Sequence, residues 1–111
     1  MQTDRCQPFV TVVCPQGHLN ASNANQFKDQ LTAAVSSHQE SILLVDMEQV
    51  ESLDSAGLMS LVSALSLSRD LDRRFSLCSV LPSIRIIFEL TQLDRVFEIF
   101  DDRAAFQSAI C

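Results

Sequence analysis

The stretch from residue 42 to about residue 69 constrains the fold most strongly. It opens with an uninterrupted apolar run, Ile42 to Val45, and such a run is typical of a strand covered on both faces. An acidic loop follows, and from Ser55 onward apolar residues recur at helical spacing. The stretch therefore predicts a strand, an acidic loop and a helix in direct succession.

The same alternation extends along the chain. Strands are expected at about residues 9–14, 42–45, 75–80 and 96–100, with a helix after each of them. Asn23 and Gln26 form a capping-box pattern at the first helix, and Asp101 and Asp102 can cap the last one. This order predicts an α/β domain with a single mostly parallel or mixed sheet of about four to five strands and four helices. The length of 111 residues fits one domain over residues 1–111.

Composition excludes several classes of partner and site. The formal net charge of −6 argues against nucleic acid and against an anionic membrane surface. No signal-type apolar region and no run of about twenty apolar residues is visible, so a cytoplasmic protein without a membrane segment is expected. The four cysteines are scattered and form no zinc-binding pattern with the two histidines. We expect free thiols, with Cys14 and Cys78 inside apolar strands, and no metal or cofactor.

Ser55 is the candidate functional residue. It stands where the second helix is expected to begin, and serine is a preferred N-cap because its hydroxyl can accept a hydrogen bond from the first turn. The same position is electrostatically receptive to an anion such as a phosphate. From the local sequence, Ser55 is therefore either a helix cap alone or a cap that also carries the function.

The helix after Ser55 lacks charge. No charged residue occurs between Asp54 and Arg69, whereas surface helices normally carry Lys and Glu on their outer face. Its outward face is expected to consist of Ala56, Met59, Ser60, Ser63 and Ser66. Such a face is covered either by a partner protein or by another part of the same fold, and the sequence leaves both alternatives open.

Enzymatic chemistry finds little support. A serine hydrolase would need a base beside Ser55, and a nucleophile elbow would need Gly where the chain has Leu53. With only two glycines in the chain, no Gly-rich phosphate loop is present. We therefore predict that the protein is not an enzyme, unless His18 lies within hydrogen-bond reach of Ser55.

A phosphate on Ser55 would act as a switch. It would add nearly two negative charges to a loop that already contains Glu51 and Asp54, with Glu48 and Asp46 before them. The helix N-terminus could hold the phosphate, so the fold should survive. A partner bound at this loop would meet like charges, which can cost several kcal/mol across an interface. The expected effect is lost binding without lost fold.

The motif at Ser55 resembles that of a known family. It reads Asp54-Ser55-Ala56-Gly57-Leu58 and is preceded by Val45-Asp46-Met47 and Val50-Glu51-Ser52-Leu53. This pattern resembles the signature of STAS-domain anti-sigma-factor antagonists. Gly17-His18-Leu19-Asn20 is similar to the family's earlier Gly-Glu-Leu-Asp turn, and residues 86–94 and 96–99 also resemble the family. The chain departs from the family at Asn20, where Asp is usual, and in residues 70–74, which lack the usual glycine.

The resemblance implies a STAS fold and a partner-switching function. In that family the Ser or Thr after the motif Asp, here Ser55, is phosphorylated by an anti-sigma-factor kinase and dephosphorylated by a PP2C-type phosphatase. The unphosphorylated protein is expected to bind an anti-sigma-type serine kinase, as a monomer or weak dimer. The residues expected to contact the kinase are Asn20, Ser22, Asp54, Ala56, Gly57, Met59, Ser60 and Ser63. The alternative is a non-switching STAS scaffold in a signalling or transport assembly.

Overall fold

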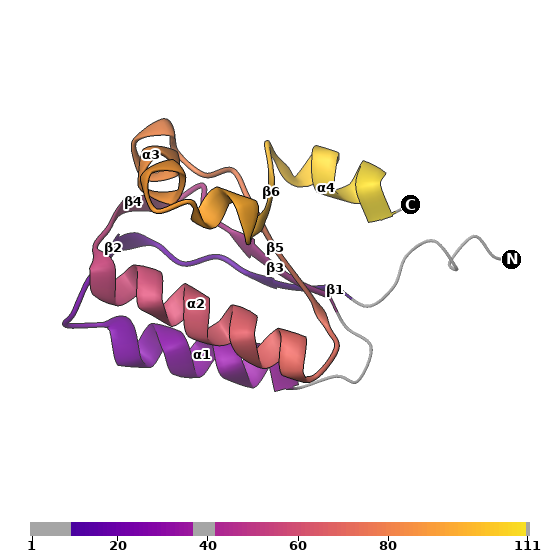
Figure 1. Cartoon of the computed structure of the whole chain (residues 1–111), viewed down its shortest axis with the longest axis horizontal. Coiled ribbons are helices and arrows are strands. Elements are labelled where there is room, and N and C mark those ends of the chain that lie inside the picture. The colour runs from indigo at the N-terminus through magenta and orange to yellow at the C-terminus, as the bar shows by residue number, and fades with distance from the viewer. Residues whose placement is uncertain (1–9, 37–41, 111) are drawn as a thin grey trace, which may run out of the picture.

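The computed structural model describes residues 10–36 and 42–110. In chain order its elements are β1 (Val10–Val13), β2 (Gly17–Leu19), α1 (Ala24–Ser36), β3 (Ile42–Asp46), β4 (Val50–Leu53), α2 (Ser55–Asp70), β5 (Arg74–Cys78), α3 (Pro82–Leu90), the 3₁₀ helix η2 (Leu93–Arg95), β6 (Glu98–Phe100) and α4 (Arg103–Ile110). Figure 1 shows the strands between two groups of helices, with α1 and α2 on one side and α3 and α4 on the other.

The strands form two parallel groups. One sheet has the order β1-β3-β5-β6, and a second, two-stranded sheet pairs β2 with β4. Parallel neighbours joined through helices are the hallmark of an α/β domain, so the predicted fold class with four helices is confirmed. The described residues hold six strands because short strands, β2 and β4, form where the sequence resembles a turn and where it predicts an acidic loop.

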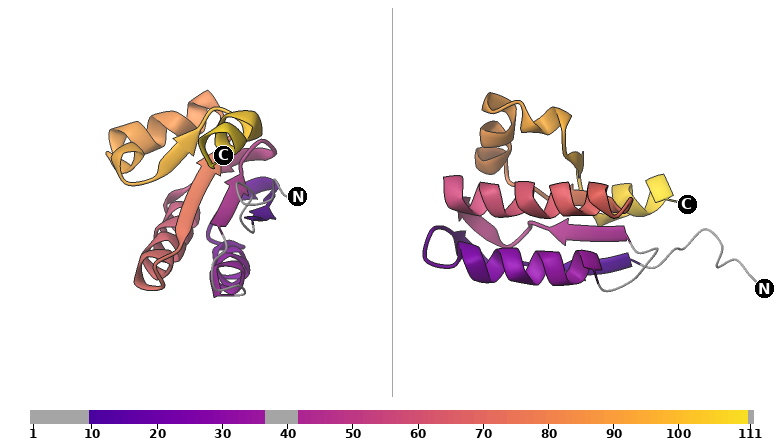
Figure 2. Two further views of the ribbon diagram at one scale, coloured as in Figure 1. Left: turned by 90° about the vertical axis from the view of Figure 1, so that its right-hand side faces the viewer. Right: turned by 60° about the horizontal axis from the view of Figure 1, so that its bottom comes forward.

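The central strand β3 explains the uninterrupted apolar run. Leu43 and Val45 pack into the main core under α1 and α2, whereas Ile42 and Leu44 pack with Phe106 of α4 on the other face. Because successive side chains of a strand point to opposite faces, both faces must be apolar when both are covered. The predicted doubly covered strand is confirmed, and Figure 2 shows the two layers from the side.

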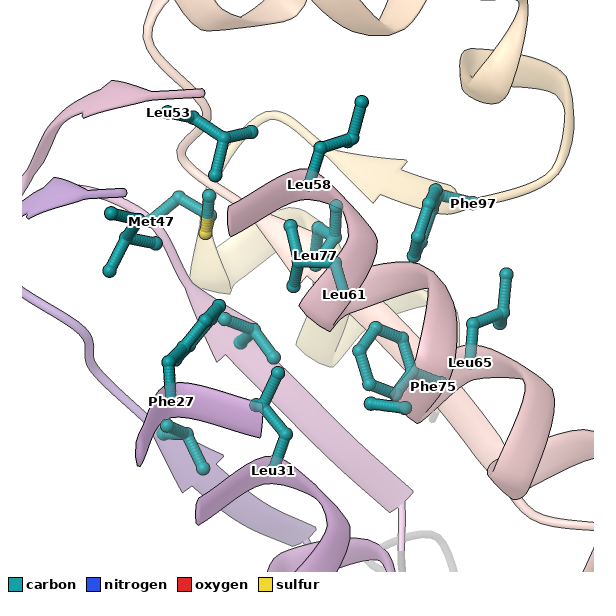
Figure 3. Close-up of a cluster of buried hydrophobic side chains, with 14 of the residues drawn as sticks. Phe27, Leu31, Met47, Leu53, Leu58, Leu61, Leu65, Phe75, Leu77 and Phe97 are labelled. Atoms are coloured by element: carbon teal, nitrogen blue, oxygen red, sulfur yellow. The ribbon is translucent and has the colours of Figure 1, made fainter. Parts of the chain in front are cut away.

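Helix α2 forms the centre of the main core. Figure 3 shows Leu58, Leu61 and Leu65 of α2 beside the aromatic rings of Phe75 and Phe97. The rings of Phe75 and Phe97 lie 5.9 Å apart between centroids. Burial of a leucine side chain contributes about 1.5–3 kcal/mol, so these contacts fix the orientation of α2 and of its first turn.

Several local predictions need correction. Asn23 precedes α1, but among the described residues its side chain bonds back to the Asn20 N–H and the His18 carbonyl rather than capping the helix. Strand β5 ends at Cys78 because Ser79 adopts a left-handed conformation with φ 58°. Strand β6 begins only at residue 98, because residues 93–95 form a 3₁₀ turn.

Other predictions concern caps and cysteines. Asp102 caps α4 as predicted, since its carboxylate accepts a hydrogen bond of 2.8 Å from the Ala105 N–H. Cys78 is a buried free thiol, whereas Cys14 is exposed beyond the end of β1, which corrects its expected place inside a strand. Cys6 and Cys111 lie outside the described residues.

The described part of the chain contains neither a membrane-spanning helix nor a cluster of metal-ligating side chains. None of its helices has the length and apolar character needed to cross a membrane. Within residues 10–36 and 42–110, no group of three or more His, Cys, Asp or Glu side chains is arranged to hold a metal ion.

Candidate phosphorylation site and partner-binding face

The N-cap of α2 is Asp54, one residue earlier than predicted. Asp54 has extended backbone angles, and its carboxylate accepts a 3.1 Å hydrogen bond from the Gly57 N–H. Aspartate and serine cap helices equally well, but a carboxylate also interacts favourably with the positive end of the helix dipole. The prediction that Ser55 is the cap was therefore wrong.

Ser55 is the first residue of α2, and its side chain is exposed. Among the described residues, no hydrogen bond joins its hydroxyl to another group, because Asp54 already performs the capping. A hydroxyl that carries no structural interaction is accessible to chemical modification. Because Asp54 is the cap, the Ser55 hydroxyl is not needed to hold the helix start and is available for modification.

Gly57 is required by close packing and not by its backbone angles. A Cβ atom at this position would lie 2.7 Å from the Leu19 carbonyl oxygen and 2.8 Å from a methyl carbon of Leu53. The first turn of α2 therefore presses directly against the end of β2. The Asp54 N–H also donates a 3.0 Å hydrogen bond to the Leu19 carbonyl, which joins the start of α2 to the end of β2.

The turn after β2 is consequently adjacent to the start of α2. The Asn20 side-chain oxygen accepts hydrogen bonds from the Ser22 N–H at 3.0 Å and from the Ser22 hydroxyl at 2.6 Å. This arrangement is an Asx turn, in which a side chain stabilises the backbone two residues further on. The structure thus brings Asn20 and Ser22 close to Asp54.

His18 is paired with a different serine. Its Nδ1 lies 2.6 Å from the Ser52 hydroxyl, and the two residues face each other on the paired strands β2 and β4. Both side chains are exposed. Hydrolase chemistry would have needed a hydrogen bond between His18 and Ser55. No such bond occurs among the described residues.

One flank of α2 is covered by α1. Ser60 is only 4% exposed, and its hydroxyl donates to the carbonyls of Ala24 in α1 and Ala56 in its own helix. Ala64 and Ser68 are also buried. Small residues allow the two helices to lie close together, as both views of Figure 2 show. The placement of Ser60 on an outward face was therefore wrong, and on this flank the covering element is the protein's own fold.

The opposite flank of α2 remains open. Met59 is 57% exposed, Ser55 and Ser66 are exposed, and Val62 is half-buried. These four residues, which we call the α2 stripe, follow one another at spacings of three or four residues and carry no charge. Ala56 and Ser63 are half-buried beside the stripe, and Gly57 is buried beneath the first turn.

The acidic residues divide into two groups. Glu51 and Asp54 are exposed directly before Ser55. Asp46, by contrast, has a side chain that is 8% exposed, and it pairs with Arg103 of α4 at 2.7 Å. Glu48 lines a surface depression together with Asp46 and Arg103. The predicted acidic crowding around Ser55 is therefore smaller than expected, because Asp46 is paired with Arg103. Glu51 and Asp54 are the exposed acidic residues directly before Ser55.

Comparisons with known proteins agree on one family. Residues 2–105 match the family model described as the STAS domain. The chain is 28% identical over 103 residues to BtrV of Bordetella bronchiseptica, named as a candidate anti-sigma factor antagonist, with 89% of this chain and 88% of that protein covered. It is also similar to the crystal structure of a candidate anti-sigma factor antagonist from Thermotoga maritima, with a TM-score of 0.82, 25% identity, and coverage of 91% of this chain and 86% of that chain.

Two further solved proteins share the fold at lower identity. SpoIIAA of Bacillus matches in its unphosphorylated form with a TM-score of 0.65 at 17% identity, covering 83% of this chain and 79% of that chain. Its phosphorylated form matches with a TM-score of 0.68 at 16% identity, covering 90% of each chain. The murine anion transporter Slc26a9 gives a TM-score of 0.76 at 17% identity, and the match covers 92% of this chain but 18% of the transporter.

Proposed function

Because the chain belongs to the STAS domain family, as its motif predicted, we propose that it is an anti-sigma factor antagonist controlled by phosphorylation of Ser55. The unphosphorylated protein binds an anti-sigma-type serine kinase, and phosphorylation releases that kinase. A PP2C-type phosphatase restores the binding form. The protein itself acts by binding and carries out no chemistry.

The observation that carries the proposal is the division of roles between Asp54 and Ser55. Asp54 holds the first turn of α2, while the Ser55 hydroxyl is exposed and, within the described residues, unbonded. A kinase can therefore modify Ser55 without removing an interaction that stabilises the fold. The fold itself is compatible with such modification, since SpoIIAA has been solved in both forms.

The binding face comprises the start of α2 and its surroundings. Its residues are Asn20, Ser22, Asp54, Ala56, Met59 and Ser63, with Gly57 shaping the first turn from beneath. Met59 supplies an exposed apolar side chain on a stripe that has no charge to desolvate. Ser60 is not included, because α1 covers it.

Phosphorylation changes this face by charge. A phosphate adds about −1.5 to −2 charges beside the carboxylates of Asp54 and Glu51. The N-terminus of α2 partly offsets this charge within the protein. A kinase surface that fits the neutral serine then meets a bulkier group and an accumulated negative charge, so the complex dissociates.

The test is a phosphorylation assay with the candidate kinase and ATP, followed by mapping of the modified residue by mass spectrometry. Ser55→Ala should abolish incorporation, whereas Ser66→Ala, which alters another exposed serine of the α2 stripe, should leave it unchanged. Ser55→Asp should prevent binding of the kinase while preserving the circular dichroism spectrum. Incorporation at another residue, or full binding by Ser55→Asp, would refute the proposal.

The second candidate function is a non-switching scaffold. It is favoured by the match to Slc26a9, in which a STAS-like fold forms part of a larger transporter, although that likeness extends only to the fold. A scaffold needs no modification of Ser55. Ser55→Ala would then retain the complete cellular function, whereas the switching function predicts a protein that stays bound to its kinase permanently.

A further inference from the structure

Helix α3 has an exposed apolar face. Ile86 is 52% exposed and Leu90 is 80% exposed, while Ile84 and Phe88 on the opposite side of the helix are buried. Pro82 and Ser83 are exposed on the same side as Ile86 and Leu90. These four exposed residues form what we call the α3 outer face. Two large aliphatic side chains, one helical turn apart and open to water, favour contact with another surface.

Two opposite charges flank the α3 outer face. Arg85 and Glu89 lie one turn apart, and their closest nitrogen and oxygen atoms are 4.0 Å apart. Both side chains are substantially exposed, so this pair contributes little within one chain. The order of a cation followed by an anion is the less favourable one along a helix.

The same charges oppose the helix dipole of α3. Arg85 lies toward the positive N-terminal end, and Glu89 lies in the last turn, near the negative end. A second α3 helix running antiparallel would reverse both relationships. Its C-terminal end would lie beside Arg85 and its N-terminal end beside Glu89.

We propose that the α3 outer face is a homodimer surface on which two copies of the chain pack their α3 helices antiparallel about a two-fold axis. In such a pair, residues at equal distances on either side of the axis meet. With the axis at the level of residue 87, Arg85 faces Glu89 of the partner subunit, and the reciprocal pair forms by symmetry. Leu90 then lies over Pro82, Ser83 and Ile86 of the partner subunit.

Charge complementarity favours a second copy as the occupant. A self-complementary patch must carry both members of each pair on one chain, and Arg85 and Glu89 beside the α3 outer face meet this condition. Two helices of nine residues make a small interface, in the class below about 1,200 Å² that characterises weak and transient complexes. The dimer is therefore expected to form reversibly at high protein concentration. It does not depend on the state of Ser55.

The first test measures self-association by sedimentation velocity over a concentration series reaching the millimolar range. The wild-type protein should show a reversible monomer–dimer equilibrium. Leu90→Lys should raise the dissociation constant by at least about tenfold, since it places a charge in the apolar contact between the two helices. Met59→Lys alters an exposed apolar residue on α2, outside the α3 outer face, and should leave the equilibrium unchanged. A wild-type protein that stays monomeric throughout, or a dimer indifferent to Leu90→Lys, would overturn the proposal.

The second test uses the symmetry of the charge pairs. Arg85→Glu makes the flank wholly acidic and Glu89→Arg makes it wholly basic, so neither variant should dimerise alone. An equimolar mixture should form heterodimers, and the double variant Arg85→Glu/Glu89→Arg should regain wild-type self-association. Because the Arg85 and Glu89 side chains are exposed, these substitutions should leave the fold unchanged, and circular dichroism checks this. If the mixture self-associates no more strongly than each variant alone, the antiparallel arrangement is refuted. If Leu90→Lys loses kinase binding, the α3 outer face is a kinase-binding surface and not a homodimer surface.

Discussion

The division of roles between Asp54 and Ser55 predicts different stabilities for substitutions at two adjacent positions. Asp54→Ala removes the carboxylate that accepts from the Gly57 N–H. Loss of such a cap costs about 1 kcal/mol, and loss of a negative charge at a helix N-terminus costs a further 0.3–1 kcal/mol or so. We therefore expect the free energy of unfolding to fall by about 1–2 kcal/mol. For a domain of this size this corresponds to a melting temperature lower by about 5–8 °C.

Two companion variants separate the contributions. Ser55→Ala should change the free energy of unfolding by less than about 0.5 kcal/mol, because the Ser55 side chain has no hydrogen bond among the described residues and alanine favours helix. Asp54→Asn keeps the accepting oxygen and loses only the charge. It should therefore fall between wild type and Asp54→Ala.

The assay is urea unfolding followed by circular dichroism, with the slope of the transition checked for constancy across the variants. The unphosphorylated protein is used throughout. If Ser55→Ala proves as destabilising as Asp54→Ala, the serine is the effective cap, and the assignment of this role to Asp54 is refuted. Equal destabilisation by Asp54→Asn and Asp54→Ala would show that charge alone matters.

Three further predictions follow from individual contacts. Gly57→Ala should destabilise despite its better helix propensity, because the added Cβ would lie 2.7 Å from the backbone oxygen of Leu19; an unchanged melting temperature would contradict this. Asp72→Gly should raise the free energy of unfolding by about 0.5–1 kcal/mol, since Asp72 has a left-handed φ of 57°, and urea unfolding checks it. The hydrogen bond from Arg74 lowers the pKa of Glu98 below its ordinary value. The stabilising contribution of the Glu98 carboxylate is therefore present above about pH 4.5 and is lost as the pH falls through the lowered pKa. Glu98→Gln should flatten the acid limb of a curve of unfolding free energy against pH.

Much of the fold is predictable from the sequence because burial on both faces leaves an unmistakable apolar run. Residues 42–45 form such a run, and the leucines of α2 recur at the helical spacing expected of one buried face. Strands β2 and β4 were missed because they are short and expose polar side chains such as His18 and Ser52. Their pairing depends on long-range contacts that no local pattern records.

At the candidate site the structure corrects two predictions, the residue that caps α2 and the flank of α2 on which Ser60 lies. Asp54 and Ser55 are both good caps, so only the backbone geometry decides which of them precedes the first helical residue. Similarly, serine and alanine occur on both flanks of α2, and composition alone cannot tell the flank under α1 from the open one. Ser60 was therefore placed with Met59, although α1 buries it.

The usual glycine missing from residues 70–74 has a structural consequence. The chain still makes the left-handed turn there, with Asp72 in the conformation that glycine adopts most easily. The turn is fixed from both sides, because the Arg73 N–H bonds the Ser68 carbonyl and the Arg73 guanidinium bonds the Val35 carbonyl at the end of α1. These bonds offset the strain at Asp72 and join the C-terminal ends of α1 and α2.

The cap by Asp54 also explains why a phosphate on Ser55 would act on binding and not on folding. The first turn of a helix leaves N–H groups without intrahelical partners, and Asp54 takes the one at Gly57. A phosphate on Ser55, the residue after Asp54, has the remaining donors of that turn within its neighbourhood, so part of its charge is offset locally. The carboxylate and the phosphate nevertheless repel each other, and both remain at the surface. A phosphate on Ser55 would therefore concentrate negative charge on the proposed binding face, while the leucines that hold α2 stay buried.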